Sequence, residues 1–354
     1  MLRFALVGCG RIAKRHAELL GLSQIDNASL VAVCDVVEKK AEYFGKKFNI
    51  PFYTDMNEMM ENENIDVVSV LTESGYHAKN VINLAKYGKH IVVEKPMALT
   101  LDDADEMINV CDANNSKLFV VKQNRFNVPV LKLREALDTN RFGKLVLGTI
   151  RVRWCRDQNY YDQASWRGKW SMDGGVLTNQ ASHHVDLLEW MMGDVESVFA
   201  KSMTALVDIE AEDTAIVTLK FKNGALGIIE ATTASRPKDL EGSISVLGSK
   251  GTVEIGGFAV NKMIHWNFQE KNDGDSEVMD KYSVNPPNVY GFGHQAYYEH
   301  VVDSILNDKA HLVDGLVGRK SLELVTAIYE SIETGKEVFL RFKPKKCKLG
   351  QLND

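Results

Sequence analysis

The chain has 354 residues, of which 45% are hydrophobic and 25% charged, which is typical of a globular protein. This length exceeds the limit of about 250 to 300 residues for a single core, so we expect two domains. A net charge of −6 and a pI near 5.9 argue against nucleic acid or an anionic membrane surface as the main partner.

The cysteines and the apolar runs indicate a cytoplasmic protein. The five cysteines are scattered and lack the paired spacing of a metal site, so reduced thiols are expected. Met1 leads directly into an apolar strand and leaves no room for a signal peptide. No apolar run approaches the length that spans a membrane, so we expect no membrane partner.

A glycine turn stands at the start of the chain, between a short β run over residues 2–7 and a helical pattern over 12–20. Gly8 permits the tight turn, Gly10 leaves room for a pyrophosphate, and Ala13 lets helix and strand pack closely. Free N–H groups at the start of the helix attract phosphate charge. In this context the pattern predicts a dinucleotide site. The residues expected to contact the cofactor here are Gly8, Gly10, Arg11 and Ile12.

The second predicted strand, residues 29–34, ends in Asp35. A carboxylate about 20 residues beyond the turn accepts hydrogen bonds from ribose hydroxyls. It also repels a 2′-phosphate, so the sequence favours NAD over NADP. The glycines and Asp35 alone leave a methyl-donor cofactor open as an alternative.

Residues 1–122 alternate between strands and helices, which predicts a parallel sheet in a Rossmann-type domain. The further elements expected are strands over 66–71, 90–93 and 117–121 and helices over 76–87 and 101–114. Their near-continuous apolar runs indicate strands that are covered on both faces.

Ligands of such sheets bind at the carboxyl ends of the strands. The segments Thr72 to His77 and Glu94-Lys95-Pro96 come at such ends. The bond before Pro96 is one that can be cis, which would turn the Lys95 ammonium toward the crevice.

Residues 123–354 are expected to form a second domain. Hairpin signals pair residues 214–221 with 226–233 and residues 243–247 with 252–255. They predict an open, mostly antiparallel sheet, so the overall fold class is α/β. The open face of that sheet needs a cover, and we expect subunits to associate through it.

The segment from Gly174 to Trp190 carries a second polar cluster. If the helix begins at Asn179, then Asn179, His183 and Asp186 share one face and require partners. His183 with Asp186 or His184 is a conceivable start of a zinc site. Neighbouring histidines diverge on a helix and no third ligand is evident, so no metal is expected.

Taken together, the Gly8 turn, Asp35, Glu94-Lys95-Pro96 and the Gly174 to Asp186 segment resemble the Gfo/Idh/MocA oxidoreductase family over almost the whole chain. This resemblance implies a Rossmann domain, a second α/β domain with a large open sheet, and dimers or tetramers, here a dimer of dimers. The family's lysine falls on Lys95 and its histidine on His183. Its usual aspartate falls on Asn179, and a proton relay through position 179 is therefore doubtful.

Further stretches resemble one branch, the bacterial dehydrogenases that oxidise C3 of UDP-N-acetylglucosaminuronate for surface polysaccharides such as lipopolysaccharide. They are residues 122–127, the Asn179-Gln180 pair, and residues 248–251 leading to Gly256-Gly257 and Asn261. The resemblance implies NAD and a nucleotide-sugar substrate. An inositol or hexose dehydrogenase of the same family remains an alternative.

Oxidation of a secondary alcohol needs a base for the hydroxyl proton while hydride leaves. We expect Lys95 to position and polarise the hydroxyl and His183 to accept the proton, with the reverse assignment open. A non-catalytic NAD-binding sensor would need neither residue, and a methyltransferase explains neither.

Arginines are expected to meet the carboxylate and diphosphate of such a substrate, and Arg125, Arg153, Arg156 and Arg167 are the candidates. The further residues expected to bind cofactor are Thr72, His77, Glu94, Lys95, Asn124, Trp166 and Arg167. The residues expected to bind substrate are Lys95, Arg125, Arg153, Tyr161, Asn179, His183 and His294.

Overall fold

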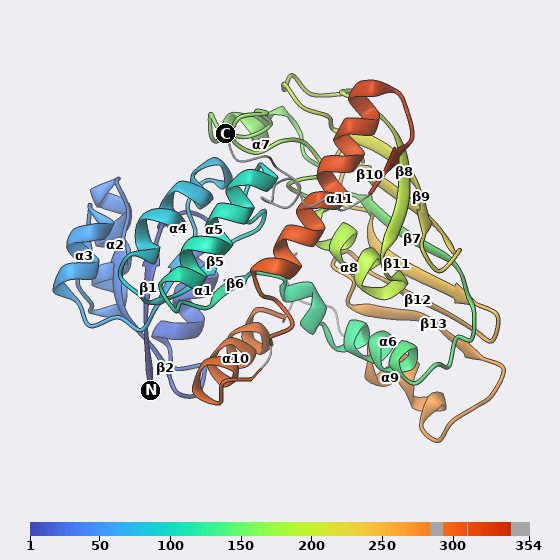
Figure 1. Cartoon of the computed structure of the whole chain (residues 1–354), viewed down its shortest axis with the longest axis horizontal. Helices are drawn as coiled ribbons and strands as arrows, with labels where there is room; N and C mark the ends of the chain where they lie inside the picture. The colour runs from blue at the N-terminus through green and yellow to red at the C-terminus, as the bar shows by residue number, and fades with distance from the viewer. Residues whose placement is uncertain (284–292, 310, 341–354) are drawn as a thin grey trace, which may run out of the picture.

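The computed structural model describes residues 1–283, 293–309 and 311–340, and they form two sheets with helices between and around them (Figure 1). The first sheet is entirely parallel and has the strand order β3-β2-β1-β4-β5-β6. Its strands are β1 (Leu2–Val7), β2 (Ala28–Cys34), β3 (Phe52–Tyr53), β4 (Val67–Val70), β5 (His90–Val93) and β6 (Leu118–Val120). This sheet with its helices, here called the parallel-sheet domain, confirms the predicted Rossmann-type architecture.

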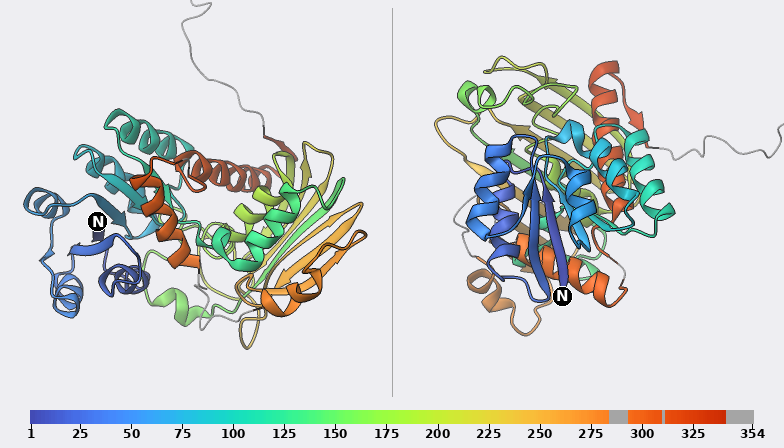
Figure 2. Two further views of the ribbon diagram at one scale, coloured as in Figure 1. Left: turned by 90° about the horizontal axis from the view of Figure 1, so that it is seen from below. Right: turned by 90° about the vertical axis from the view of Figure 1, so that its left-hand side faces the viewer.

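Helices cover both faces of the parallel sheet (Figure 2). They are α1 (Ala13–Gly21), α2 (Glu38–Phe48), α3 (Met56–Asn62), the 3-10 helix η1 (Ser74–Tyr76), α4 (His77–Ala85) and α5 (Leu101–Ala113). Along β1, Phe4 and Leu6 enter one apolar core, while Ala5 and Val7 enter the other. Successive side chains of a strand point to opposite faces, so both faces are buried, as the continuous apolar runs predict.

The second sheet has eight strands in the order β13-β12-β11-β7-β10-β9-β8-β14, and only the β7–β10 pair is parallel. Its strands are β7 (Leu145–Arg153), β8 (Val195–Met203), β9 (Thr214–Phe221), β10 (Leu226–Thr232), β11 (Glu241–Gly248), β12 (Gly251–Gly256), β13 (Lys262–Phe268) and β14 (Val338–Phe339). The hairpins β9–β10 and β11–β12 are those expected from the sequence. We call this part the open-sheet domain.

One face of the eight-stranded sheet packs against helices and the other is open (Figure 2). The packed helices are α6 (Val128–Asp138), α8 (Ser182–Met192) and α11 (Gly315–Thr334). On the open face, Met203, Ile216 and Leu226 are each more than half exposed. The smaller elements beside this domain are η2 (Gln123–Phe126), α7 (Gln158–Asp162), η3 (Asp275–Glu277) and α9 (Val278–Lys281).

Helix α10 (Gly293–Leu306) returns to the parallel-sheet domain late in the chain (Figure 1). Its Tyr297 and Tyr298 are fully buried and share an apolar core with Phe4. The Tyr298 ring lies 5.6 Å from the Phe4 ring, edge to face. The division at residue 122 stays a prediction, because residues far beyond it complete the first core.

Two further observations concern membrane-spanning helices and the cysteine thiols. In the described part of the chain, no helix has both the length and the apolar character needed to cross a membrane. Cys9, Cys34, Cys111 and Cys155 are free thiols, and burial raises the pKa of the first three to about 12. Cys347 lies outside the described residues.

Candidate active site

A cleft of about 860 Å³ is lined by residues of both domains, at the carboxyl ends of the parallel strands. Most of the site residues expected from the sequence line it. They are Gly8, Gly10, Arg11, Ile12, Asp35, Thr72, His77, Glu94, Lys95, Trp166, Arg167, Asn179, His183 and His294.

The glycine turn has the geometry that a dinucleotide requires. Gly8 has φ +100°, and a Cβ there would lie 2.7 Å from the backbone of Leu71 and Thr72. A Cβ at Gly10 would meet nothing within 4 Å, so the backbone borders open space in the cleft. Asp35 accepts hydrogen bonds from the backbone N–H of Cys9 and of Val37, both at 2.8 Å. The turn therefore fixes the carboxylate at the end of β2, and these residues fit NAD.

Lys95 follows β5, and its bond to Pro96 is cis. Its ammonium donates to the backbone oxygen of Asn179 at 2.6 Å and lies 3.5 Å from the side-chain oxygen of the same residue. Burial lowers the pKa of Lys95, while the carboxylates of Glu94 and Asp173 oppose that shift. The lysine is thus held against the loop that precedes α8.

His183 lies in the first turn of α8, and its Nε2 accepts a hydrogen bond from the Gln123 side-chain nitrogen at 3.0 Å. Burial lowers the pKa of His183 well below 6.5, and the positive charges of Lys95 and Lys122 lower it further. The imidazole is consequently neutral near pH 7. A neutral imidazole can accept a proton at Nε2 once the hydrogen bond from Gln123 releases that lone pair.

The prediction that the helix begins at Asn179 is wrong, because α8 begins at Ser182 and Asn179 lies in the preceding turn. Gly174 has φ +69° there, and the Asn179 N–H donates to the Gly175 oxygen at 3.0 Å. The turn points the Asn179 carbonyl at Lys95 instead of continuing the helical ladder. His183 and Asp186 do form a polar stripe, and the η2 segment supplies a partner to each.

Four predicted binding residues do not line the cleft. Arg125 is buried and makes a two-fold hydrogen bond, both distances 2.8 Å, to the Asp186 carboxylate. Arg153 makes the same kind of pair with Glu230, at 2.6 and 2.7 Å. Both guanidinium groups are paired with carboxylates of the protein, Arg125 in the interior and Arg153 at a partly exposed site, and these pairs hold them away from the cleft.

The other two are held in the protein interior. Tyr161 is buried with its hydroxyl 3.3 Å from that of Thr233, and Asn124 is buried within η2.

Some cleft residues were not expected from the sequence as site residues. Gln180 lines the cleft, and neither side-chain polar atom has a partner among the described residues. Gln123 also lines the cleft, and its side-chain oxygen is likewise unpartnered. Arg156, which was a candidate from the sequence for the anionic groups of the substrate, also lines the cleft while paired with Asp239 at 2.9 Å. The sequence signals for both glutamines were the motifs of the branch resemblance, namely the Asn179-Gln180 pair and residues 122–127.

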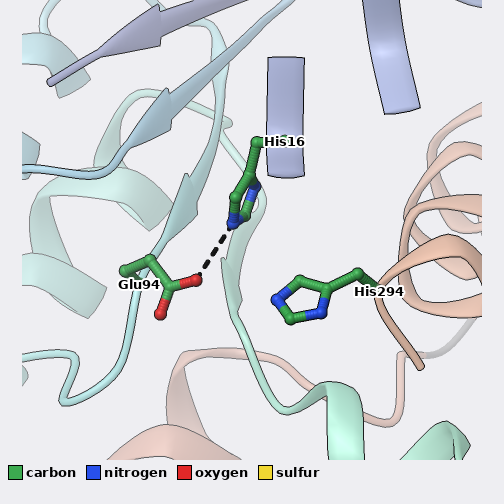
Figure 3. A group of neighbouring side chains, drawn as sticks. All are labelled: His16, Glu94 and His294. Atoms are coloured by element: carbon green, nitrogen blue, oxygen red, sulfur yellow. Dashed lines mark hydrogen bonds and ion pairs between the residues drawn. The ribbon is translucent and has the colours of Figure 1, made fainter. Parts of the chain in front are cut away.

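His16, Glu94 and His294 bring α1, the end of β5 and α10 together, and the last two also line the cleft (Figure 3). The His16 ring nitrogens lie 2.6 Å from the Tyr298 hydroxyl and 3.0 Å from Glu94. Burial by itself raises the pKa of Glu94, but the His16 bond and the charges nearby outweigh it and lower the pKa to about 2. The three residues lie within 4.8 Å of one another, as metal ligands would. Both His16 nitrogens are already bonded, one to Tyr298 of α10 and one to Glu94. We therefore assign these three residues to holding α10 against the parallel-sheet domain.

This fold and cleft define an NAD-dependent dehydrogenase. The family profile described as "Oxidoreductase family, NAD-binding Rossmann fold" matches residues 2–122, and "Oxidoreductase family, C-terminal alpha/beta domain" matches residues 134–340. The chain therefore belongs to the Gfo/Idh/MocA oxidoreductase family, whose relatives here are NAD-dependent sugar dehydrogenases.

Two solved structures and one curated relative show how far the similarity extends. The WlbA dehydrogenase from Bordetella pertussis, crystallised with NADH and UDP-GlcNAcA, is 41% identical, with 97% of this chain and 98% of that one covered and a TM-score of 0.92. The WlbA dehydrogenase from Chromobacterium violaceum, with the same ligands, is also 41% identical, with 97% and 96% covered and a TM-score of 0.90. Myo-inositol 2-dehydrogenase from Thermotoga maritima is 34% identical over 260 residues, which are 71% of this chain and 74% of that protein.

Proposed function

We propose that the protein oxidises the C3 hydroxyl of UDP-N-acetylglucosaminuronate to the 3-keto sugar with NAD, in the biosynthesis of a surface polysaccharide. The observation that carries the proposal is the 41% identity, over 97% of the chain, to a dehydrogenase crystallised with NADH and UDP-GlcNAcA. In support, Asp35, Lys95 and His183 line one cleft.

The two reacting side chains divide the work according to their charges. Bound NAD supplies the hydride acceptor at the nicotinamide ring. Lys95 is the hydrogen-bond donor that positions and polarises the sugar hydroxyl, since two carboxylates favour its ammonium form. His183, kept neutral by burial and by neighbouring cations, accepts the hydroxyl proton. The negative charge that develops on the sugar oxygen is stabilised by the adjacent ammonium.

An anionic nucleotide sugar needs local positive charge in a protein whose net charge is −6. Arg11, Arg156 and Arg167 line the cleft, and we assign them, in place of Arg125 and Arg153, to the diphosphate and carboxylate of the substrate and to the cofactor. The unpartnered amide of Gln180 offers both a donor and an acceptor to the neutral part of the sugar.

The test is to mix the purified protein with NAD and UDP-N-acetylglucosaminuronate and follow the absorbance of reduced nicotinamide, with and without an added 2-keto acid. We expect the absorbance to rise, either by the amount of a single turnover or continuously over many turnovers. If bound cofactor is reoxidised in place, the keto acid extends a single turnover to many. Activity solely on free polyols would contradict the proposal.

A second candidate is an inositol or hexose dehydrogenase, favoured by the 34% identity to myo-inositol 2-dehydrogenase. Such an enzyme would use the same lysine and histidine. A side-by-side screen of UDP-sugars against free inositol and hexoses separates the two candidates. Only the UDP-sugars carry a diphosphate that needs the cationic groups of the cleft.

We also propose that the protein is a homo-oligomer, a dimer of dimers, in which the open face of the eight-stranded sheet is covered by another subunit. The exposed apolar side chains of that face are Phe199, Met203, Ile216, Leu226 and Ile228. Light scattering should report more than one chain at micromolar concentration, and a monomer would contradict this. The cytoplasmic location expected from the thiols stays a prediction.

A further inference from the structure

A chain of short contacts leads from the Lys95 ammonium to a buried carboxylate that the mechanism has not used. The Asn179 side-chain nitrogen donates to Asp173 Oδ1 at 2.6 Å, while its oxygen and backbone carbonyl face the Lys95 ammonium. The other Asp173 oxygen accepts from the Gly168 N–H at 3.2 Å. Asp173 is only 1% exposed and does not line the cleft.

Asn179 stands where the family resemblance expects an aspartate, and the geometry shows why an amide suits this chain. An amide has a donor and an acceptor, so it binds a carboxylate on one side and an ammonium on the other. An aspartate at 179 would place an oxygen about 2.6 Å from Asp173 Oδ1. Two carboxylates at that distance cannot both ionise. In this chain the carboxylate on the Asn179 side of the lysine is therefore that of Asp173, and the Asn179 side chain lies between the two.

We propose that Asp173 is a positioning residue that acts through the Asn179 amide, holding the Lys95 ammonium in the cleft and stabilising its charge. The inference rests on Lys95 taking part in the reaction as proposed above, but it does not depend on which sugar is oxidised.

The charged groups around Lys95 set the direction of the expected effect. Burial lowers the pKa of Lys95; Glu94 and Asp173 raise it, and Lys122 and Arg156 lower it. His77 and His183 also lie close enough for the Lys95 charge to lower their pKa values. Removal of the Asp173 charge takes away one of the two carboxylates, so the pKa of Lys95 must fall.

The experiment measures Lys95 ionisation directly in the full-length protein, with no substrate present. Acetic anhydride acetylates only neutral amines, so the extent of Lys95 labelling across a pH series, quantified by mass spectrometry of its peptide, gives a midpoint. The variants are D173N, which removes the charge, and the swap D173N/N179D, which returns a carboxylate beside the lysine. The matched control is D162N, since Asp162 is exposed in α7 and contacts Gln158.

We expect the D173N midpoint to fall by about one pH unit, the swap to stand at or above the wild-type midpoint, and D162N to match wild type. A wild-type midpoint in folded D173N would overturn the proposal. If D173N does not fold, the swap decides: a midpoint at or above wild type supports the proposal and a lowered one overturns it. Because labelling needs no sugar, a failure of the proposed substrate leaves this result intact, and the two failures are distinguishable.

Discussion

Lys95 and His183 line the same cleft but have opposite electrostatic surroundings. The lysine, at the end of β5, has the carboxylates Glu94 and Asp173 near it. For the histidine, in the first turn of α8, the ammonium groups of Lys95 and Lys122 have the larger effects, ahead of the carboxylates of Glu94 and Asp186. Burial lowers the pKa of both side chains, yet the neighbouring charges with the largest effects oppose the shift at Lys95 and add to it at His183.

In the mechanism that we propose, this difference separates a charged donor from a neutral acceptor at one reacting oxygen. The two residue types alone left the assignment of the base open, since either side chain accepts a proton once its pKa is suitable. The neighbours favour the assignment that we propose, and they come from η2, the loop before α8 and the end of β5. Substitutions that change the charges around Lys95 or around His183 therefore test this difference.

The largest effect is expected for Lys95→Ala, which removes the charged member of the pair. We expect kcat to fall by about 10³-fold, within the range for loss of a positioned acid–base group. The pKa of His183 should rise, because the Lys95 charge helps to lower it. Turnover assays and NAD binding by calorimetry check this, with the exposed Lys86→Ala as control. Turnover within about tenfold of wild type would contradict the role of Lys95.

His184 is buried in α8 beside the histidine that we assign as base, and its protonation should affect the folding stability. Neither ring nitrogen of His184 has a partner among the described residues, and burial lowers its pKa to about 3. The unfolded chain, with a histidine pKa near 6.5, binds more protons between pH 6.5 and 3, so folding stability falls as pH falls. The loss should reach about 2 kcal/mol at pH 5.

Chemical denaturation of His184→Leu at pH 7 and pH 5 should show most of that dependence removed. The exposed His265→Leu is the matched control and should keep it. An unchanged pH dependence in His184→Leu would mean that other groups carry it.

On the strand-end side, Asp35→Asn removes the charge that disfavours a 2′-phosphate while keeping an acceptor for the Cys9 N–H. We expect the ratio of kcat/KM for NAD over NADP to fall about tenfold, equivalent to about 1.4 kcal/mol. The exposed Asp26→Asn, ahead of β2, should leave the ratio unchanged. An unaltered ratio in Asp35→Asn would assign cofactor choice to other residues of the cleft.

The smallest change sharpens the comparison by adding an anion to the histidine's side. Gln123→Glu places a carboxylate against the His183 ring in place of the amide 3.0 Å away. The pKa of His183 should rise by about one unit. Because the base must be neutral, the acid limb of the kcat/KM pH profile should move to higher pH by a similar amount. Gln24→Glu, an exposed site, is the control, and an unmoved limb would argue that His183 is not the titrating base.

Part of the site was predictable because its chemistry is local. The glycine turn requires φ > 0 at Gly8 and an open backbone at Gly10, and both requirements are visible within a few residues. The same holds for Asp35 and Lys95, which come one and two residues after strands whose apolar runs identify them. The hairpins β9–β10 and β11–β12 were predictable for the same reason.

The side-chain partners were not predictable, because they join residues that are distant in sequence. Arg125 was expected to meet an anionic substrate, but it finds Asp186, 61 residues away, once α8 packs beside η2. The same packing brings Gln123 to His183 across 60 residues. A buried charge must be paired, and which partner it takes depends on the packed geometry of the elements.

The sequence by itself determined the alternation of strands and helices and the cofactor turn, because these depend on short-range periodicity and backbone conformation, while the choice of Lys95 and His183 came from the family resemblance. Only the tertiary structure decided that α10 completes the first core, that Asn179 lies in a turn, and that Asp173 reaches Lys95 through it. Those outcomes follow from burial, which forces each polar group to take a partner from whatever element packs against it.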